Sequence, residues 1–182
     1  MKRQLYSPLS ISLLTTDCAQ NIWTKKPSKK YIRDVSDLLL GTAAHESGGF
    51  RYNRQMRFSY TSTRGAWGIW QIESISVKDT LQKLQDRPEL DKNCGCWLVQ
   101  SDRGPRLSEL HSAPIDYCRT FPYSPAMCCI FARLHYLFKP GKIPSDITGQ
   151  AEYWKKWYNT IEGAGTVDQY IKSWNDNVER AN

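Results

Sequence analysis

Apolar residues recur three and four positions apart in several stretches of the chain, which is the spacing of one face of an α-helix. The clearest stretch covers residues 31–46, and its apolar face consists of Ile32, Val35, Leu38, Leu39 and Ala43. Gly48 and Gly49 follow this stretch, and glycine is common immediately after a helix. We therefore expect a helix that ends near Glu46.

Four further helices are predicted farther along the chain. Residues 76–86 and 149–161 carry a helical pattern, with aromatic side chains on the second stretch. A Ser–Pro pair at 124–125 is typical of a helix start, because the hydroxyl caps the first turn and proline suits the first helical position. Thr166 and Gln169 predict a capping box at the start of the last helix.

Three segments lack a clear helical pattern. Residues 1–30 are expected to form an irregular arm, which would serve as a docking segment. Residues 50–64 are polar with partial alternation, which favours a short irregular hairpin or loop. Residues 87–123 contain Pro, Gly and many charged side chains, so we expect a long loop or insertion there. The predicted fold class is mainly α (α+β), with one domain over 31–182 and a small β element after the first helix.

The composition of the 182-residue chain is that of a folded protein, with 40% hydrophobic and 12% aromatic residues. It excludes a disordered, collagen-like or coiled-coil protein. No apolar run approaches the roughly 18 residues of a membrane-spanning helix. The net charge of +7 favours an anionic partner such as nucleic acid, anionic lipid or anionic cell-wall polymer. Nucleic acid is the least favoured, because the aromatic residues cluster with acidic and amide side chains rather than with Lys and Arg.

The six cysteines leave three interpretations open, namely disulfide bridges, free or buried thiols, and a zinc site. The zinc ligands would be Cys94, Cys96, His111 and Cys118. Thiols are favoured, because the pairs at 94–96 and 128–129 are poorly placed to bridge internally and Cys-x-Cys is not the usual spacing of a zinc site. We therefore predict no metal and no cofactor.

Glu46 is the first candidate for chemistry, because it lies at the end of an apolar helix face, beside two alanines. Burial disfavours the charged form of a carboxyl group and so raises its pKa. Such a group can hold a proton near neutral pH and donate it to the leaving oxygen of a glycoside. Its neighbour His45 points about 100° away around the helix, so we expect it to pack or to lie at the surface. Asp34 and Asp37 are expected to be charges near the helix start.

Residues 65–73 form a glycine-punctuated stretch that is suited to a ligand. Glycines such as Gly68 let a backbone approach a ligand closely. Trp67 and Trp70 offer flat faces suited to sugar rings, and Gln71 supplies both a hydrogen-bond donor and an acceptor. A third stretch, 157–165, places a phenol and an amide next to a glycine-bracketed turn.

Taken in order, these stretches resemble the three signatures of the soluble lytic transglycosylase family, which belongs to the lysozyme-like superfamily. The matching residues are Glu46-Ser47, Gly65-Ala66-x-Gly68-Ile69-x-Gln71-Ile72, and Tyr158-Asn159 before Gly163-x-Gly165. The sequence is more similar still to the phage-encoded branch, through residues 41–47, 132–136 and 153–166. The resemblance spans about residues 34–175 and covers 87–123 poorly.

The resemblance implies a lysozyme-like fold whose cleft binds peptidoglycan glycan strands. Glu46 would protonate the glycosidic oxygen between N-acetylmuramic acid and N-acetylglucosamine and then accept the proton of the muramyl 6-hydroxyl, which gives a 1,6-anhydro product. The residues expected to bind substrate are Ser47, Gly68, Trp70, Gln71, Glu73, Tyr158 and Asn159. The phage likeness, and the lack of a recognisable secretory signal, imply a virion-associated enzyme that docks on tail or baseplate proteins through residues 1–30 and acts in the host periplasm or cell wall.

Two alternatives stay open. Glu73 stands where the family usually has a proline-containing turn. If Glu73 faces Glu46, the chain would be a hydrolytic muramidase (lysozyme), because inverting hydrolases use two carboxyl groups about 6.5–9.5 Å apart. The other alternative is a phage tail structural protein that keeps the same scaffold with little activity.

Overall fold

The computed structural model describes residues 5–22, 26–53, 65–160 and 163–179, and this part of the chain is mainly helical. The α-helices are α1 (Pro8–Asn21), α2 (Lys29–Glu46), α3 (Ser74–Gln85), α4 (Pro88–Val99), α5 (Pro114–Thr120), α6 (Pro125–Leu137), α7 (Ile147–Trp154) and α8 (Val167–Asn177). A 3-10 helix, Leu107–Glu109, precedes α5, and a π-helical turn, Lys155–Asn159, continues α7. The predicted mainly helical class is confirmed.

The small β element that we expected after the first helix is not seen in the described residues. Most of the expected hairpin, residues 54–64, lies outside them. The described residues contain an isolated antiparallel bridge instead, in which Trp67 and Ile72 exchange two backbone hydrogen bonds of 2.9 Å. This bridge closes a tight turn within the glycine-punctuated stretch.

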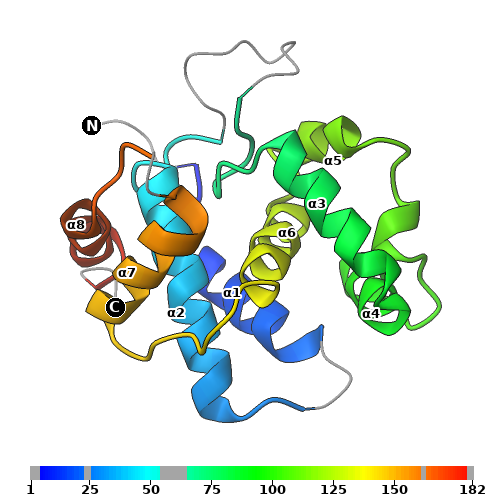
Figure 1. Ribbon diagram of the computed structural model, residues 1–182, viewed down its shortest axis with the longest axis horizontal. Helices are drawn as coiled ribbons and strands as arrows, with labels where there is room; N and C mark the ends of the chain where they lie inside the picture. Colours follow the sequence, from blue (N-terminus) through cyan, green and yellow to red (C-terminus); the bar gives the residue numbers. More distant parts are fainter. Residues whose placement is uncertain (1–4, 23–25, 54–64, 161–162, 180–182) are drawn as a thin grey trace.

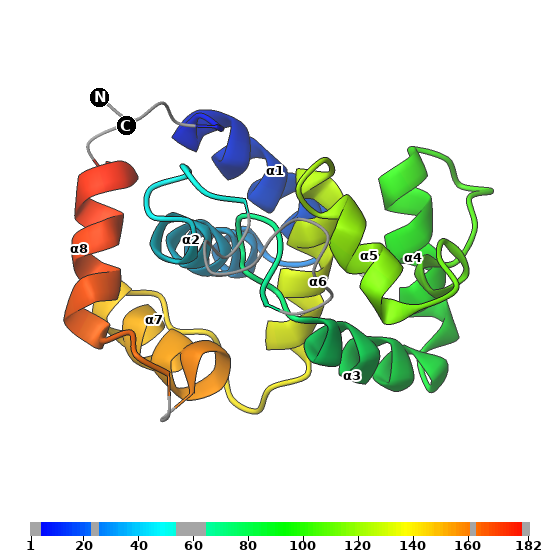
Figure 2. The same ribbon diagram turned by 90° about the horizontal axis from the view of Figure 1, so that it is seen from above.

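Helices α2 and α6 lie at the centre of the fold (Figure 1). α2 contacts α1, α6, α7 and α8, whereas α6 contacts α1 to α5 and the π-helical turn. Seen from above, α7 and α8 lie on one side of α2, and α3, α4 and α5 lie beyond α6 on the other side (Figure 2). Elements from distant parts of the sequence therefore meet between α2 and α6.

The helices predicted from periodicity and capping signals form close to the expected positions. α2 begins at Lys29 and ends at Glu46, followed by Gly48 and Gly49 with φ of 60° and 78°. The Ser124 hydroxyl caps α6, and the capping box of Thr166 and Gln169 opens α8. The aromatic stretch expected to be helical over 149–161 divides into α7 and the π-helical turn.

The expectation of an irregular arm over residues 1–30 was wrong for the part that forms α1. This helix packs against α2 and α6, and its buried residues include Ile11, Cys18 and Ala19. The Thr15 hydroxyl lies 2.8 Å from the hydroxyl of Ser36 on α2. The packed face of α1 consists largely of small and polar side chains, so it has no apolar stripe that a search for periodicity would detect.

The expectation of a long loop over 87–123 was also wrong, because α4, the 3-10 helix and α5 form there. Asp91 in the first turn of α4 accepts hydrogen bonds from the backbone and the hydroxyl of Ser108. A Cβ at Gly95 would collide with the backbone of residues 105–107, so glycine lets this segment lie against α4. Buried Tyr117 donates a 2.6 Å hydrogen bond to the Leu107 carbonyl. These local polar contacts order a segment that is poor in apolar periodicity.

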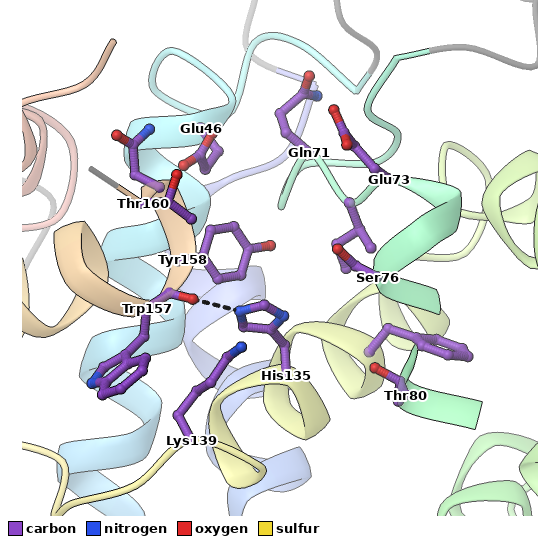
Figure 3. A pocket seen from close by; sticks show the side chains of 13 residues that line it. Glu46, Gln71, Glu73, Ser76, Thr80, His135, Lys139, Trp157, Tyr158 and Thr160 are labelled. Atoms are coloured by element: carbon purple, nitrogen blue, oxygen red, sulfur yellow. Dashed lines mark hydrogen bonds between the residues drawn. The ribbon is translucent and has the colours of Figure 1, made fainter. Parts of the chain in front are cut away.

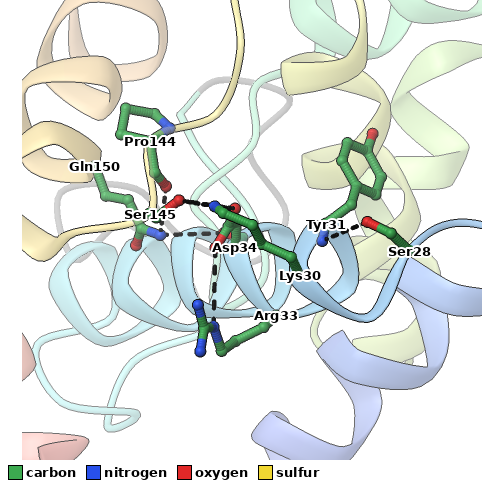
Figure 4. A network of polar contacts seen from close by, with 8 residues as sticks. All are labelled: Ser28, Lys30, Tyr31, Arg33, Asp34, Pro144, Ser145 and Gln150. Atoms are coloured by element: carbon green, nitrogen blue, oxygen red, sulfur yellow. Dashed lines mark hydrogen bonds and ion pairs between the residues drawn. The ribbon is translucent and has the colours of Figure 1, made fainter.

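A polar network joins the first half of α2 to the segment that precedes α7 (Figure 4). Asp34 accepts hydrogen bonds from Lys30 at 2.7 Å and from Ser145 at 3.0 Å. Gln150 donates to the backbone carbonyls of Asp34 and Pro144. Asp34 therefore has a structural role in holding α7 against α2, rather than acting as a charge at the helix start.

All six cysteines are free thiols, and five of them are buried. Among the described residues, no group of three or more His, Cys, Asp or Glu side chains could hold a metal ion. None of the described helices combines the length and the apolar character that a membrane span needs.

Candidate active site

A pocket of about 390 Å³ opens between α2 and the π-helical turn on one side and α3 on the other, with α6 between them (Figure 3). Its lining residues are Glu46, Gln71, Ile72, Glu73, Ser76, Thr80, Phe131, His135, Lys139, Trp157, Tyr158, Asn159 and Thr160. Five of the eight residues proposed from the sequence line this one pocket, namely Glu46, Gln71, Glu73, Tyr158 and Asn159. The three separate stretches identified in the sequence therefore converge in the fold.

Glu46 is the last residue of α2, and its carboxyl group is partly buried at one end of the pocket. The indole N–H of Trp154, a fully buried residue, donates a 3.0 Å hydrogen bond to Glu46 Oε1. Burial raises the pKa of Glu46 to about 7, although the Trp154 bond acts in the opposite direction because it stabilises the carboxylate. A carboxyl group with this pKa can donate a proton and take one back near neutral pH.

Gln71 is held at the pocket by the turn that the Trp67–Ile72 bridge closes. Its backbone has a φ of 49°, in the left-handed region, and its side-chain nitrogen donates a 2.7 Å hydrogen bond to the Gly68 carbonyl. The amide oxygen accepts no hydrogen bond from the residues that the structure describes. Gln71 therefore offers a fixed acceptor to a hydroxyl or N–H group of a ligand.

Tyr158 lies within the π-helical turn and connects it to the opposite stretch. Its hydroxyl donates a 2.6 Å hydrogen bond to the Trp70 carbonyl, and its ring stacks on Tyr136 with centroids 5.2 Å apart. Burial, with a further contribution from Glu46, holds the pKa of Tyr158 well above its usual value. Because the hydroxyl already donates to Trp70, Tyr158 can meet a ligand as a rigid wall and as an acceptor.

Asn159 is fixed by Lys155, which lies one helical turn earlier. Lys155 Nζ lies 2.9 Å from Asn159 Oδ1 and 2.7 Å from the Gly163 carbonyl. The side-chain oxygen of Asn159 is therefore occupied, and its amide nitrogen is the group that remains for a ligand.

Three of the expected substrate-binding residues do not line the pocket. Trp70 is fully buried, and its indole donates to the Leu39 carbonyl at 2.8 Å, so the expectation that it stacks on a sugar was wrong. Ser47 is buried and donates to the Ala43 carbonyl at 2.6 Å. A Cβ at Gly68 would collide with Cys128 on α6, so this glycine allows the turn to pack on α6. All three residues support the pocket from behind.

Glu73 lines the pocket, whereas His45 does not. Glu73 is exposed at the N-terminus of α3 and faces the pocket from the wall opposite Glu46 (Figure 3). His45 instead packs edge-on against Trp154, with ring centroids 4.5 Å apart, and its Nδ1 lies 3.3 Å from the Ser173 hydroxyl. The expectation that His45 packs away from the chemistry agrees with these contacts.

The sequence did not single out the other end of the pocket, which is lined by His135 on α6 and by Lys139, just beyond the end of α6 at Leu137. His135 Nε2 lies 2.8 Å from the Trp157 carbonyl, and burial lowers the His135 pKa to about 4. The imidazole is therefore neutral at pH 7, with Nε2 as the donor and Nδ1 as an acceptor. His135 gave little signal because the other side chains of α6 are mostly apolar, and Lys139 lies in the segment after the helix.

Comparison of the chain with known protein families, with curated proteins and with solved structures finds no match. The function must therefore be inferred from the chemistry of the pocket.

Proposed function

We propose that this protein is a peptidoglycan-cleaving lytic transglycosylase with a lysozyme-like fold. The observation that carries the proposal is the meeting of Glu46, Gln71, Tyr158 and Asn159 in one pocket around a carboxyl group whose pKa is about 7. These residues come from the three stretches that resemble the family signatures. A mainly helical chain with a pocket between its central helices is compatible with the proposed fold.

In the first step, the protonated Glu46 carboxyl gives its proton to the glycosidic oxygen that leaves the muramyl anomeric carbon, and the bond between them breaks. Gln71 would accept a hydrogen bond from the sugars through its amide oxygen, Asn159 would donate one through its amide nitrogen, and the Tyr158 ring would limit where the sugars can lie. The Trp154 N–H then stabilises the carboxylate that the proton leaves behind.

In the second step, the Glu46 carboxylate takes the proton of the muramyl 6-hydroxyl as that oxygen bonds to the anomeric carbon. The product is a 1,6-anhydro sugar, and Glu46 regains its proton, so the cycle closes without water. An intramolecular nucleophile has a high effective concentration, which favours this route in a pocket with one partly buried carboxyl group.

A hydrolytic alternative is supported by one observation, which is that Glu73 lines the same pocket. In that reaction Glu73 would activate a water molecule for attack on the anomeric carbon. The exposure of Glu73 favours the transglycosylase, because an exposed carboxylate makes few contacts that would hold it and a water molecule in one geometry.

The two acidic residues provide a matched experiment, in which Glu46→Gln and Glu73→Gln are assayed for solubilisation of purified peptidoglycan. We expect Glu46→Gln to lose at least about 99% of the activity, since removal of an essential general acid costs about 10²–10⁴-fold. Glu73→Gln should keep activity within a few-fold of the wild type. Full activity of Glu46→Gln would contradict the proposal, and loss of activity in Glu73→Gln would favour the hydrolase.

We also propose that the protein associates with a phage particle through its N-terminal region. This association is supported by the phage-branch resemblance and by Leu9 and Leu13, which lie four residues apart on α1 and are each more than half exposed, as is Leu5 before the helix. An apolar stripe of this kind suits a protein partner, here a tail or baseplate protein. The same surface would serve the alternative of a weakly active tail structural protein.

A further inference from the structure

The end of the pocket away from Glu46 differs in chemistry from the catalytic end. Figure 3 shows Glu46, Gln71 and Glu73 at one end and Lys139 at the other, with Nζ of Lys139 directed toward His135. Between the two ends lie Ser76 of α3 and the neutral imidazole of His135, whereas buried Thr80 lies across the pocket from Lys139 (Figure 3). The pocket therefore runs from a proton donor, past uncharged hydrogen-bonding groups, to a cation.

Lys139 forms no ion pair within the part of the chain that the structure describes. Its side chain is half-buried, and its pKa is lowered by burial and by the nearby positive charge of Lys83. The nearby carboxylate of Asp79 is 2.6 Å from Lys83 Nζ, so it is paired there. A partly desolvated ammonium group inside a polar pocket gains most from an anion supplied by a ligand.

The positive charge continues beyond Lys139 along one surface. Lys139 also lines a neighbouring hollow with Lys83, Arg87 and the acidic residue Asp86. The cationic groups of Lys83 and Arg87 lie 5.7 Å and 5.1 Å from the centre of the Phe138 ring. A ligand chain that leaves the pocket at Lys139 would therefore cross a surface that carries both signs of charge with an excess of cations. The glycan backbone bears no charge in its N-acetylated form, whereas the peptides attached to muramic acid carry carboxylates.

We infer that Lys139 is the specificity residue of a subsite that binds a carboxylate of the peptide attached to muramic acid. The inference rests on the proposed function and deepens it, since the substrate becomes a peptide-bearing glycan rather than a bare one. Ser76 and the His135 Nδ1 would bind the hydroxyl and amide groups between the scissile bond and that carboxylate.

The test measures binding and cleavage separately. Binding is measured by calorimetry in the Glu46→Gln background, with soluble muropeptide oligomers that carry the peptide and with the same oligomers after an amidase has removed it. Lys139→Met should weaken binding of the peptide-bearing oligomers about tenfold, the size of one charge-assisted hydrogen bond. It should leave binding of the bare glycan unchanged, and Lys139→Arg should restore part of the loss. Lys78→Met, on an exposed part of α3 outside the pocket, serves as the control.

The inference would be overturned if the Lys139→Met protein bound the peptide-bearing oligomers as tightly as the Lys78→Met control does. It would also be overturned if Lys139→Met weakened binding of the peptide-bearing and the bare oligomers by the same factor. In cleavage assays with Glu46 present, Lys139→Met should raise KM about tenfold on the peptide-bearing glycan alone, with kcat preserved. Selective loss of binding without any cleavage by the wild type would refute the proposed function and still uphold the carboxylate subsite.

Discussion

The hydrogen bond from Trp154 to Glu46 gives the most direct control over the proposed acid. Replacing Trp154 by Phe removes the indole N–H and leaves an aromatic side chain in the same place. Because this N–H stabilises the carboxylate, its loss should raise the Glu46 pKa above the present value of about 7. The protonated form would then persist to higher pH.

The size of the effect follows from the geometry of the bond. A hydrogen bond to a charged group contributes about 1.5–3 kcal/mol, and about 1.4 kcal/mol corresponds to one pH unit in a titration. The 3.0 Å bond has ordinary length, so we expect the lower end of this range and a displacement of about one pH unit. In Trp154→Phe, the alkaline limb of the pH profile of kcat/KM, which reports deprotonation of the acid in the free enzyme, should move to higher pH by the same amount.

The assay is carbon-13 NMR of the Glu46 carboxyl group, followed through a pH titration and compared with the pH profile of kcat/KM. Trp70→Phe is the matched control, because it also removes a buried indole N–H but one that donates to the Leu39 carbonyl. The titration midpoint should rise in Trp154→Phe and stay in Trp70→Phe. An unchanged or lowered midpoint in Trp154→Phe would refute the assigned role of this hydrogen bond.

Two further predictions concern stability. Burial raises the Glu46 pKa from 4.5 to about 7, so the folded state loses stability as pH rises between these values. Glu46→Gln removes this penalty, and its free energy of unfolding in urea should gain up to about 3 kcal/mol relative to the wild type between pH 4 and pH 8. A difference between the two proteins that stays constant with pH would contradict the prediction. Ile11→Ala should destabilise the fold by about 2–5 kcal/mol, because the Ile11 side chain is 2% exposed. Leu9→Ala, at a 65% exposed position, should change stability by less than about 0.5 kcal/mol but lower incorporation into phage particles. Equal effects of the two variants on unfolding would show that α1 is not part of the core.

The parts of the fold with strong local signals could be predicted from the sequence. α2 has a wide apolar face, and α8 has a capping box, so both form where the pattern places them. α1 could not be predicted, because small side chains such as Ala19 and Thr15 provide its packing. The prediction of a loop over residues 87–123 failed for a related reason, since the structure of this segment depends on polar contacts such as that of Asp91 with Ser108.

The candidate site divides in the same way. Glu46, Gln71 and Tyr158 were proposed because their residue types suit the chemistry, and the fold places them together. Trp70 has an equally suitable side chain, but the direction it faces depends on the turn formed by the Trp67–Ile72 bridge, which no periodicity indicates. His135 was missed because its position at the pocket depends on how α6 packs between α3 and the π-helical turn.

Mass spectrometry of the sugar ends released from purified peptidoglycan tests the central claim most directly. If Glu46 works alone as acid and then base, the muramyl ends are 1,6-anhydro and one water lighter than hydrolysed ends, and they are absent from the Glu46→Gln digest. Hydrated reducing ends as the main product, or release of the same fragments by Glu46→Gln, would contradict it.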